Sequence, residues 1–164
     1  MKKTHNYLAI FLLILISRVV PHPPNFTPII ALSFYIPAIL GSKFFPFYLF
    51  SYILIDLFFG FHDASFFVWG SIIFISLISK YLGTLFITRI FGVIGGSIIF
   101  FILTNFGVWT SGYYGYTLAG LISCYIAAIP FFGNTLVATI IYASLIELII
   151  KLFFPNSIMS KRNF

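Results

Sequence analysis

The chain has 164 residues, of which 61% are hydrophobic and only 7% are charged. Soluble globular domains carry about 25% charged residues, so this composition excludes that class and predicts an integral membrane protein. The formal net charge is +6, but the basic residues are scattered singly or in pairs, which favours membrane topology over a nucleic-acid partner. A single cysteine, Cys124, excludes an intrachain disulfide framework.

The first apolar segment covers about residues 6–20 and follows Lys2 and Lys3, as in a secretory signal peptide. The residues after it lack the small-residue pattern that a signal peptidase needs, so we expect the segment to remain as a helix. It is short for a hydrocarbon core that takes about 20 helical residues to cross. No long linker, low-complexity run or repeat follows, which predicts a single membrane domain over residues 1–164.

Proline and glycine mark several positions in the following helices. Thr27 and Pro28 predict a helix entry, because threonine can cap a helix and proline fits its first turn. Pro37 lies within the same predicted helix and predicts a kink. Gly92 and Gly96 have the small-xxx-small spacing that lets two helices approach closely. The five further membrane helices are expected at about residues 27–41, 46–60, 65–82, 90–106 and 134–153.

Residues 117–129 form a shorter helix-like stretch that is followed by Pro130. At a rise of 1.5 Å per residue such a helix reaches about 20 Å, too little for the hydrocarbon core. We therefore expect a re-entrant or interfacial helix at this point. The predicted fold class is an all-α integral membrane protein with six transmembrane helices and this additional short helix.

The positions of the charged residues agree with six spans. If the N-terminus is cytoplasmic, eight of the nine basic residues fall on the inner side and only Arg18 falls outside. We therefore predict a multi-pass protein of the inner (cytoplasmic) membrane with both termini in the cytoplasm. Glu147 and Lys151 are four residues apart and are expected to pair in the last helix. The eight inner residues are Lys2, Lys3, Lys43, Lys80, Arg89, Lys151, Lys161 and Arg162.

This topology gathers polar side chains at the outer ends of the helices and in the outer loops. Ionisable groups at membrane depth are costly unless they are paired, so we expect Arg18 and Asp56 to be in contact. Stiff bends at the prolines of residues 21–28 and at Pro130 would hold the loops around an outward-facing cavity, with the aromatic loop at 107–116 as a lid. The predicted substrate-binding residues are Arg18, His22, Asn25, Asp56, His62, Asn105, Trp109 and Asn134.

Each of these residues also has a purely structural interpretation. Arg18 can extend to the membrane interface, with Asp56 as its structural partner. His22 can satisfy a backbone carbonyl, and His62 with Asp63 can form a helix-entry turn. Trp109 and the loop tyrosines fit an interfacial aromatic belt, and Cys124 fits a small packing residue.

Enzymatic chemistry has little support in the sequence. The chain has no phosphate-binding glycine loop and no nucleophile elbow. His22, His62, Asp63 and Cys124 lack metal-ligand spacing, so we expect no metal and no cofactor. An intramembrane enzyme that uses His22 or His62 with Asp63 as acid and base remains the last-ranked alternative.

Four motifs together resemble the signature of a bacterial membrane-protein family of unknown function. In size and six-helix layout that family is similar to the substrate-binding S components of energy-coupling factor (ECF) vitamin transporters. The match covers about residues 6–150. The motifs are R-V-V-P-H-P-P-N-F-T-P at 18–28, D-L-F-F-G-F-H at 56–62, T-N-F-G-V-W at 104–109 and C-Y-I-A-A-I-P-F-F at 124–132.

The resemblance implies an S-component-like bundle that binds a vitamin-like or cofactor-precursor molecule from the outside. Its partners would be a transmembrane coupling protein and two cytoplasmic ATPases, besides the lipid bilayer and the solute. Ala9 is the only small residue of the first helix before Ser17, whereas S components carry small residues there for docking. A solitary ion-coupled transporter and a non-transporting scaffold or assembly protein therefore remain alternatives.

Overall fold

The computed structural model describes residues 3–153, and the regular structure in this range is helical. A short π-helical segment (η1) and a 3-10 segment (η2) separate the second and third helices. The elements are α1 (Lys3–Val19), α2 (Ile29–Tyr35), η1 (Ile36–Leu40), η2 (Ser42–Phe44), α3 (Phe45–Phe59), α4 (Ser65–Leu82), α5 (Phe86–Thr110) and α6 (Leu118–Phe153).

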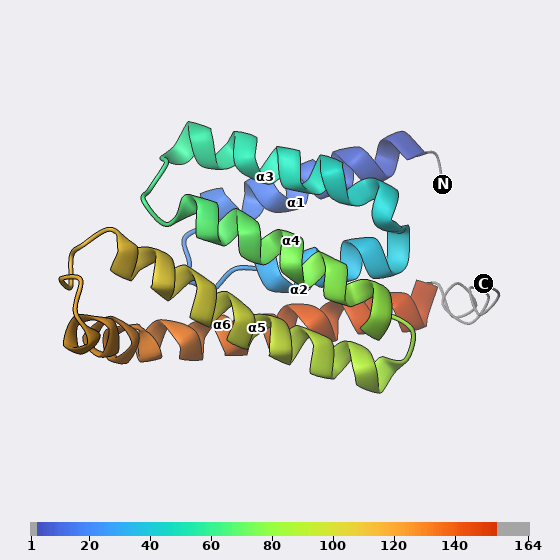
Figure 1. Cartoon of the computed structure of the whole chain (residues 1–164). Helices are drawn as coiled ribbons and strands as arrows, with labels where there is room; N and C mark the ends of the chain where they lie inside the picture. The colour runs from blue at the N-terminus through green and yellow to red at the C-terminus, as the bar shows by residue number, and fades with distance from the viewer. Residues whose placement is uncertain (1–2, 154–164) are drawn as a thin grey trace.

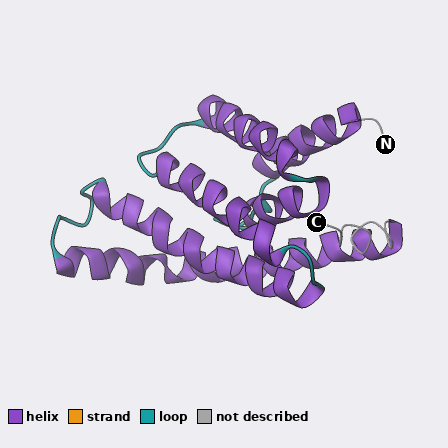
Figure 2. Cartoon of the chain, turned by 45° about the vertical axis from the view of Figure 1, so that its right-hand side comes forward, coloured by secondary structure: helices purple, strands orange, loops and turns teal. Residues whose placement is uncertain are grey.

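The six α-helices run up and down alongside one another (Figure 1). The segments at 20–28, 60–64 and 111–117 all lie at one end of the bundle, which we call the polar end. Helices α5 and α6 extend beyond the other helices at this end (Figure 2). The chain enters and leaves the described structure at the opposite end.

Helix α6 corrects the prediction of a separate short helix at 117–129. It continues through Pro130 for 36 residues, a length of about 54 Å. Transmembrane helices tolerate proline because neighbouring helices, serine and threonine side chains, ordered water and local changes of helix geometry satisfy the backbone groups that the proline frees. The whole length of residues 118–153 is therefore one helix that is longer than a hydrocarbon core of about 30 Å.

The other helix boundaries differ from the predicted ones by only a few residues. Helix α4 begins and ends where the sequence predicts, whereas α5 is longer than predicted at both ends. Thr27 does not cap α2, which begins after Pro28 without a side-chain cap. Pro37 lies in the π-helical segment η1, and the single wide turn accommodates the proline where the sequence predicts a kink.

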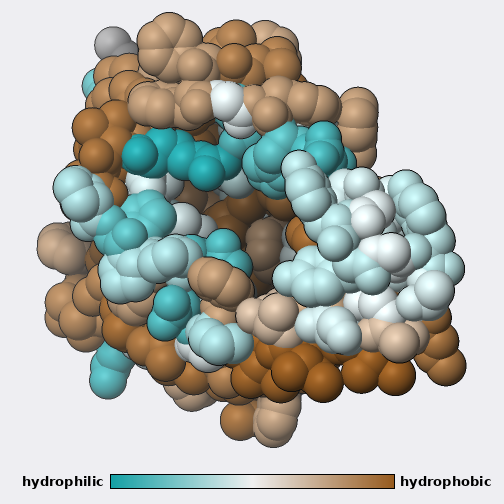
Figure 3. Space-filling model, turned by 90° about the vertical axis from the view of Figure 1, so that its left-hand side faces the viewer, coloured by the Kyte–Doolittle hydropathy of each residue, from teal (hydrophilic) through white to brown (hydrophobic). Residues whose placement is uncertain are grey.

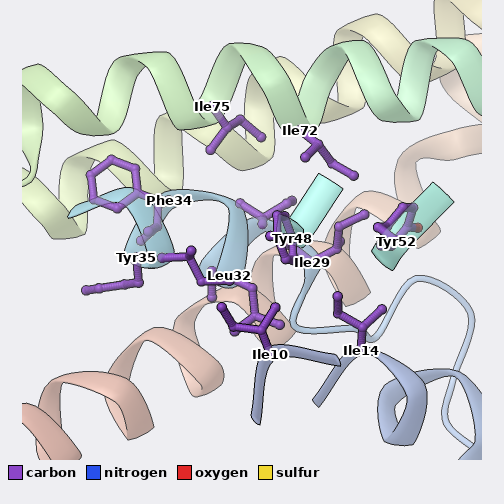
Figure 4. Packing of buried hydrophobic residues seen from close by; sticks show 14 of the residues in the cluster. Ile10, Ile14, Ile29, Leu32, Phe34, Tyr35, Tyr48, Tyr52, Ile72 and Ile75 are labelled. Carbon is purple, nitrogen blue, oxygen red and sulfur yellow. The ribbon is translucent and has the colours of Figure 1, made fainter. Parts of the chain in front are cut away.

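Helix α2 lies in the middle of the bundle, and all seven of its residues are buried. Figure 4 shows its isoleucine and aromatic side chains between those of α1, α3 and α4. Gly92 and Gly96 of α5 face this helix, and a methyl group at Gly92 would collide with the ring of Phe34. The predicted close approach of helices at these two glycines is confirmed.

The outer surface of the bundle is rich in large apolar side chains, as at Leu13, Phe58 and Ile126. Buried positions instead include many small hydroxyl residues, and Ser97 of α5 donates a hydrogen bond to Thr139 of α6 over 3.1 Å. An apolar exterior around an interior with small polar residues is typical of helices packed in lipid. Four helical stretches, Ser42–Phe59, Ser65–Leu82, Phe86–Thr110 and Leu118–Phe153, are long and apolar enough to cross a membrane.

Candidate functional site

A cavity of about 430 Å³ opens at the polar end of the bundle. Figure 3 shows this face, where hydrophilic side chains surround a hollow with a hydrophobic interior. Every α-helix contributes to the lining, so the cavity depends on the tertiary fold. The polar lining residues are Arg18, His22, Asn25, Thr27, Tyr52, His62, Thr104, Asn105, Tyr114, Cys124 and Thr135.

One wall of the cavity contains an ion pair between Arg18 of α1 and Asp56 of α3. Nη2 of Arg18 also donates to the hydroxyl of Tyr52 over 2.7 Å, and the guanidinium carbon lies 5.0 Å from the centre of that ring. Only 3% of the Asp56 side chain is exposed, and Nε1 of Trp69 donates to its Oδ2 over 3.0 Å. The predicted contact between Arg18 and Asp56 is confirmed, although Asp56 itself does not line the cavity.

The proline-rich segment at 20–28 forms a second part of the rim. Asn25 has a φ of 62°, a left-handed conformation that asparagine tolerates better than most residues. Asn134 of α6 donates from Nδ2 to the carbonyl oxygen of Pro24 over 3.0 Å and so fastens this segment to the bundle. Asn134 therefore supports the rim without lining the cavity.

His22 is held by backbone groups on both sides of its ring. Nδ1 lies 2.8 Å from the carbonyl oxygen of Pro23, and Nε2 lies 3.0 Å from that of Ser17. Carbonyl oxygens only accept hydrogen bonds, so both contacts are hydrogen bonds together only when both ring nitrogens carry a proton. The structural interpretation of His22 is thus correct in part, while its side chain also lines the cavity.

Three further predicted residues differ in their placement. Asn105 lines the cavity and donates to the carbonyl oxygen of Phe101 in its own helix over 2.7 Å. His62 also lines the cavity, and its backbone N–H donates to Oγ of Ser65 in the turn before α4. Trp109 does not line the cavity. Its indole donates to the carbonyl oxygen of Gly115 and fastens the end of α5 to the next loop.

Sequence reasoning missed most of the wall that α6 provides. Cys124, Ala128, Phe131 and Thr135 all line the cavity and recur at the spacing of one helical face. The sequence prediction ended a helix before Pro130, which divided this face of α6 into two segments and hid the spacing of its residues. Trp69 was also missed, although a partly buried indole N–H commonly has an acceptor.

A second ion pair lies at the opposite end of the bundle. Arg89 of α5 contacts both carboxylate oxygens of Glu147 on α6, at 2.6 and 2.8 Å. The hydroxyl of Tyr35 donates to the same carboxylate over 2.6 Å and connects α2 to the cluster. The predicted pair of Glu147 with Lys151 is wrong, because Glu147 faces the helix interface and Lys151 is exposed.

Within residues 3–153 no three side chains of histidine, cysteine, aspartate or glutamate come together as a metal site would require. The cavity therefore offers hydrogen bonds, one guanidinium group and aromatic surface. Such a lining can bind and orient a small molecule.

A family model described as "Family of unknown function (DUF6580)" matches residues 1–158. The chain belongs to this family. No curated protein and no solved structure matches the chain.

Proposed function

We propose that this DUF6580 protein is a membrane-embedded solute-binding or transport subunit that takes up a small molecule from the outer side. The observation that carries the proposal is the cavity at the polar end, whose volume of about 430 Å³ lies in the range of small-molecule sites. Five of the eight residues selected from the sequence line it. Polar groups that would only stabilise the fold have no need to surround a hollow.

The proposal includes a topology of six spans in the inner membrane, with both termini cytoplasmic and the cavity facing outward. Lys43, Lys80 and Lys151 lie in helical segments at the end opposite the cavity, which supports a cytoplasmic assignment for that end. Arg18 is at the other end, where its charge is offset by Asp56. An outward site then has its polar rim on the side from which the solute arrives.

From the sequence resemblance to ECF S components alone, we extend the proposal to a vitamin-like or cofactor-precursor solute. The same resemblance extends the proposal to a transmembrane coupling protein with ATPase subunits as partners. The surface of α1 carries large exposed side chains, including Leu8, Leu12 and Ile16, in place of small docking residues. A solitary ion-coupled transporter is therefore the variant to be distinguished from an ATPase-driven one.

The experiment is purification of the tagged full chain from cells grown in rich medium. Mass spectrometry would identify both the small molecules and the proteins that remain bound. We expect a retained solute that is lost in the Thr135→Phe variant, because Thr135 lines the cavity and a phenyl ring would fill it. A Ser144→Phe variant on the exposed side of the same helix should retain it. Absence of any solute, with uptake unaffected by Thr135→Phe, would contradict the proposal.

A membrane scaffold is the second candidate, and one observation favours it. Both carboxylate oxygens of Asp56 are bound by Arg18 and Trp69, as expected of a residue that fixes helix positions. A scaffold predicts that Asp56→Asn and Trp109→Ala change stability or partner recovery and leave solute binding unchanged.

A further inference from the structure

The charges around the cavity are distributed unequally. The guanidinium of Arg18 lines it, whereas no aspartate or glutamate among the described residues does so. Asp56 neutralises Arg18 from outside the lining, and its oxygens are bound by Arg18 and Trp69. A solute in the cavity therefore meets N–H donors before it meets any carboxylate.

Arg18 has hydrogen-bonding capacity that the protein leaves unused. Its contacts with Tyr52 and Asp56 both come from Nη2. Nε is buried and has no hydrogen-bond partner in the described structure. Because Nε has almost no accessible surface, a solute reaches Arg18 through the 29% of its side chain that is exposed, and a charged donor there is suited to an added acceptor.

The rest of the cavity is suited to an apolar body of moderate size. Phe100, Val68 and Phe131 are part of the lining, and the interior of the hollow is hydrophobic (Figure 3). The volume equals that of about 14 water molecules in the liquid. A single aromatic ring with one substituent fits within this space.

We propose that the cavity selects a small organic anion, an oxyanion such as a carboxylate on an apolar or aromatic body, with Arg18 as the group that contacts the oxyanion. This inference rests on the proposed solute-binding function and specifies the class of solute. Arg18 provides charge-assisted donors, which bind a carboxylate more strongly than a neutral group. A cation of the same size would find no carboxylate on the wall with which to pair.

The test uses the full chain in lipid nanodiscs and three probes that differ only in their head group: benzoate, benzamide and benzylammonium. The readout is the rate at which the small reagent methyl methanethiosulfonate modifies Cys124, which lines the cavity with only 2% of its surface exposed. Thr104→Cys in a Cys124→Ser background supplies a second reporter on the facing helix. A probe that occupies the cavity slows both reactions.

We expect benzoate to protect both thiols and benzylammonium to need a concentration about tenfold higher, since a hydrogen bond to a charged group contributes at least that much. The paired variant Arg18→Gln with Asp56→Asn leaves no unpaired charge and should abolish this preference. Equal or better protection by benzamide or benzylammonium would overturn the inference about the anion and leave the proposed solute binding intact. Thiols that react but that none of the three probes protects would have the same two consequences. A cavity in which neither thiol reacts would contradict the proposed function itself.

Discussion

Arg18 and Asp56 are 38 positions apart in the sequence and form an ion pair that joins α1 to α3 at the wall of the cavity. The two partners are unequally buried, since 29% of the Arg18 side chain is exposed and only 3% of the Asp56 side chain is. Trp69 adds a hydrogen bond from α4, so three helices meet at one carboxylate. The contact therefore fixes the geometry of the wall.

Removing only the cation should be more harmful than neutralising both partners. Arg18→Ala leaves the buried carboxylate of Asp56 with Trp69 alone, and breaking a buried pair costs about 3 kcal/mol of unfolding free energy. The double variant Arg18→Gln with Asp56→Asn should lose less. Detergent titration of the protein in bicelles measures the unfolding free energy of both variants. An equal loss of unfolding free energy in the two would contradict this account of the pair.

Helices α5 and α2 pack closely at Gly92, whereas Gly95 on α5 has open space around it and serves as the control. Gly92→Ala places a methyl group against the ring of Phe34, and such overpacking costs about 1–3 kcal/mol. Gly95→Ala meets no atom within 4 Å and should stabilise the helix slightly. Thermal unfolding of the two variants distinguishes packing from helix propensity, which predicts the same gain for both.

The ion pair of Arg89 with Glu147, at the opposite end of the bundle, can be tested at Tyr35, whose hydroxyl donates to the same carboxylate. Tyr35→Phe removes the hydrogen bond to the carboxylate of Glu147, and bonds to charged groups contribute about 1.5–3 kcal/mol. Tyr142→Phe is the control, because no hydrogen bond of its hydroxyl is found among the described residues. Lys151→Ala should have no measurable effect on stability, since Glu147 binds Arg89. A larger loss for Lys151→Ala than for Tyr35→Phe would refute the arrangement.

The proline-rich segment is fastened to α6 through one amide. Asn134→Ala removes the hydrogen bond to the carbonyl oxygen of Pro24, a loss of about 1 kcal/mol. The freed segment should let thiol reagents reach Cys124 faster, because it forms part of the cavity rim. Ser144→Ala, on an exposed position of the same helix, should leave the modification rate unchanged. Unaltered kinetics in Asn134→Ala would mean that the segment does not restrict entry.

Local patterns predict the helical class, the bounds of α4 and the contact of Arg18 with Asp56. The last of these follows from charge alone, since an arginine and an aspartate at similar depth in an apolar chain need partners. The pairing of Arg89 with Glu147 could not be found in this way. Which helices are neighbours decides that contact, and four-residue spacing favoured Lys151 instead.

The cavity wall was predictable only in part for a similar reason. Loop residues such as His22 and Asn25 are conspicuous as polar groups in an apolar chain. Thr104 and Thr135 resemble the hydroxyl residues that pack between helices elsewhere in the bundle, and only the tertiary arrangement separates the two roles. Proline at position 130 gave a misleading helix end, because a helix packed in a membrane protein can continue through a proline whose freed backbone groups are satisfied by neighbouring groups.

The most direct test of an outward-facing cavity uses Thr104→Cys, at a half-buried position of the lining, in a Cys124→Ser background, because Cys124 is only 2% exposed. Intact cells and inside-out vesicles would be treated with sulfonatoethyl methanethiosulfonate, a charged reagent that does not cross membranes. Cys124→Ser controls for background, and Thr84→Cys in that variant reports the opposite end of the bundle. The account predicts that the residue-104 cysteine is modified in intact cells and the residue-84 cysteine only in inside-out vesicles. Modification of the residue-104 cysteine solely in inside-out vesicles would contradict it.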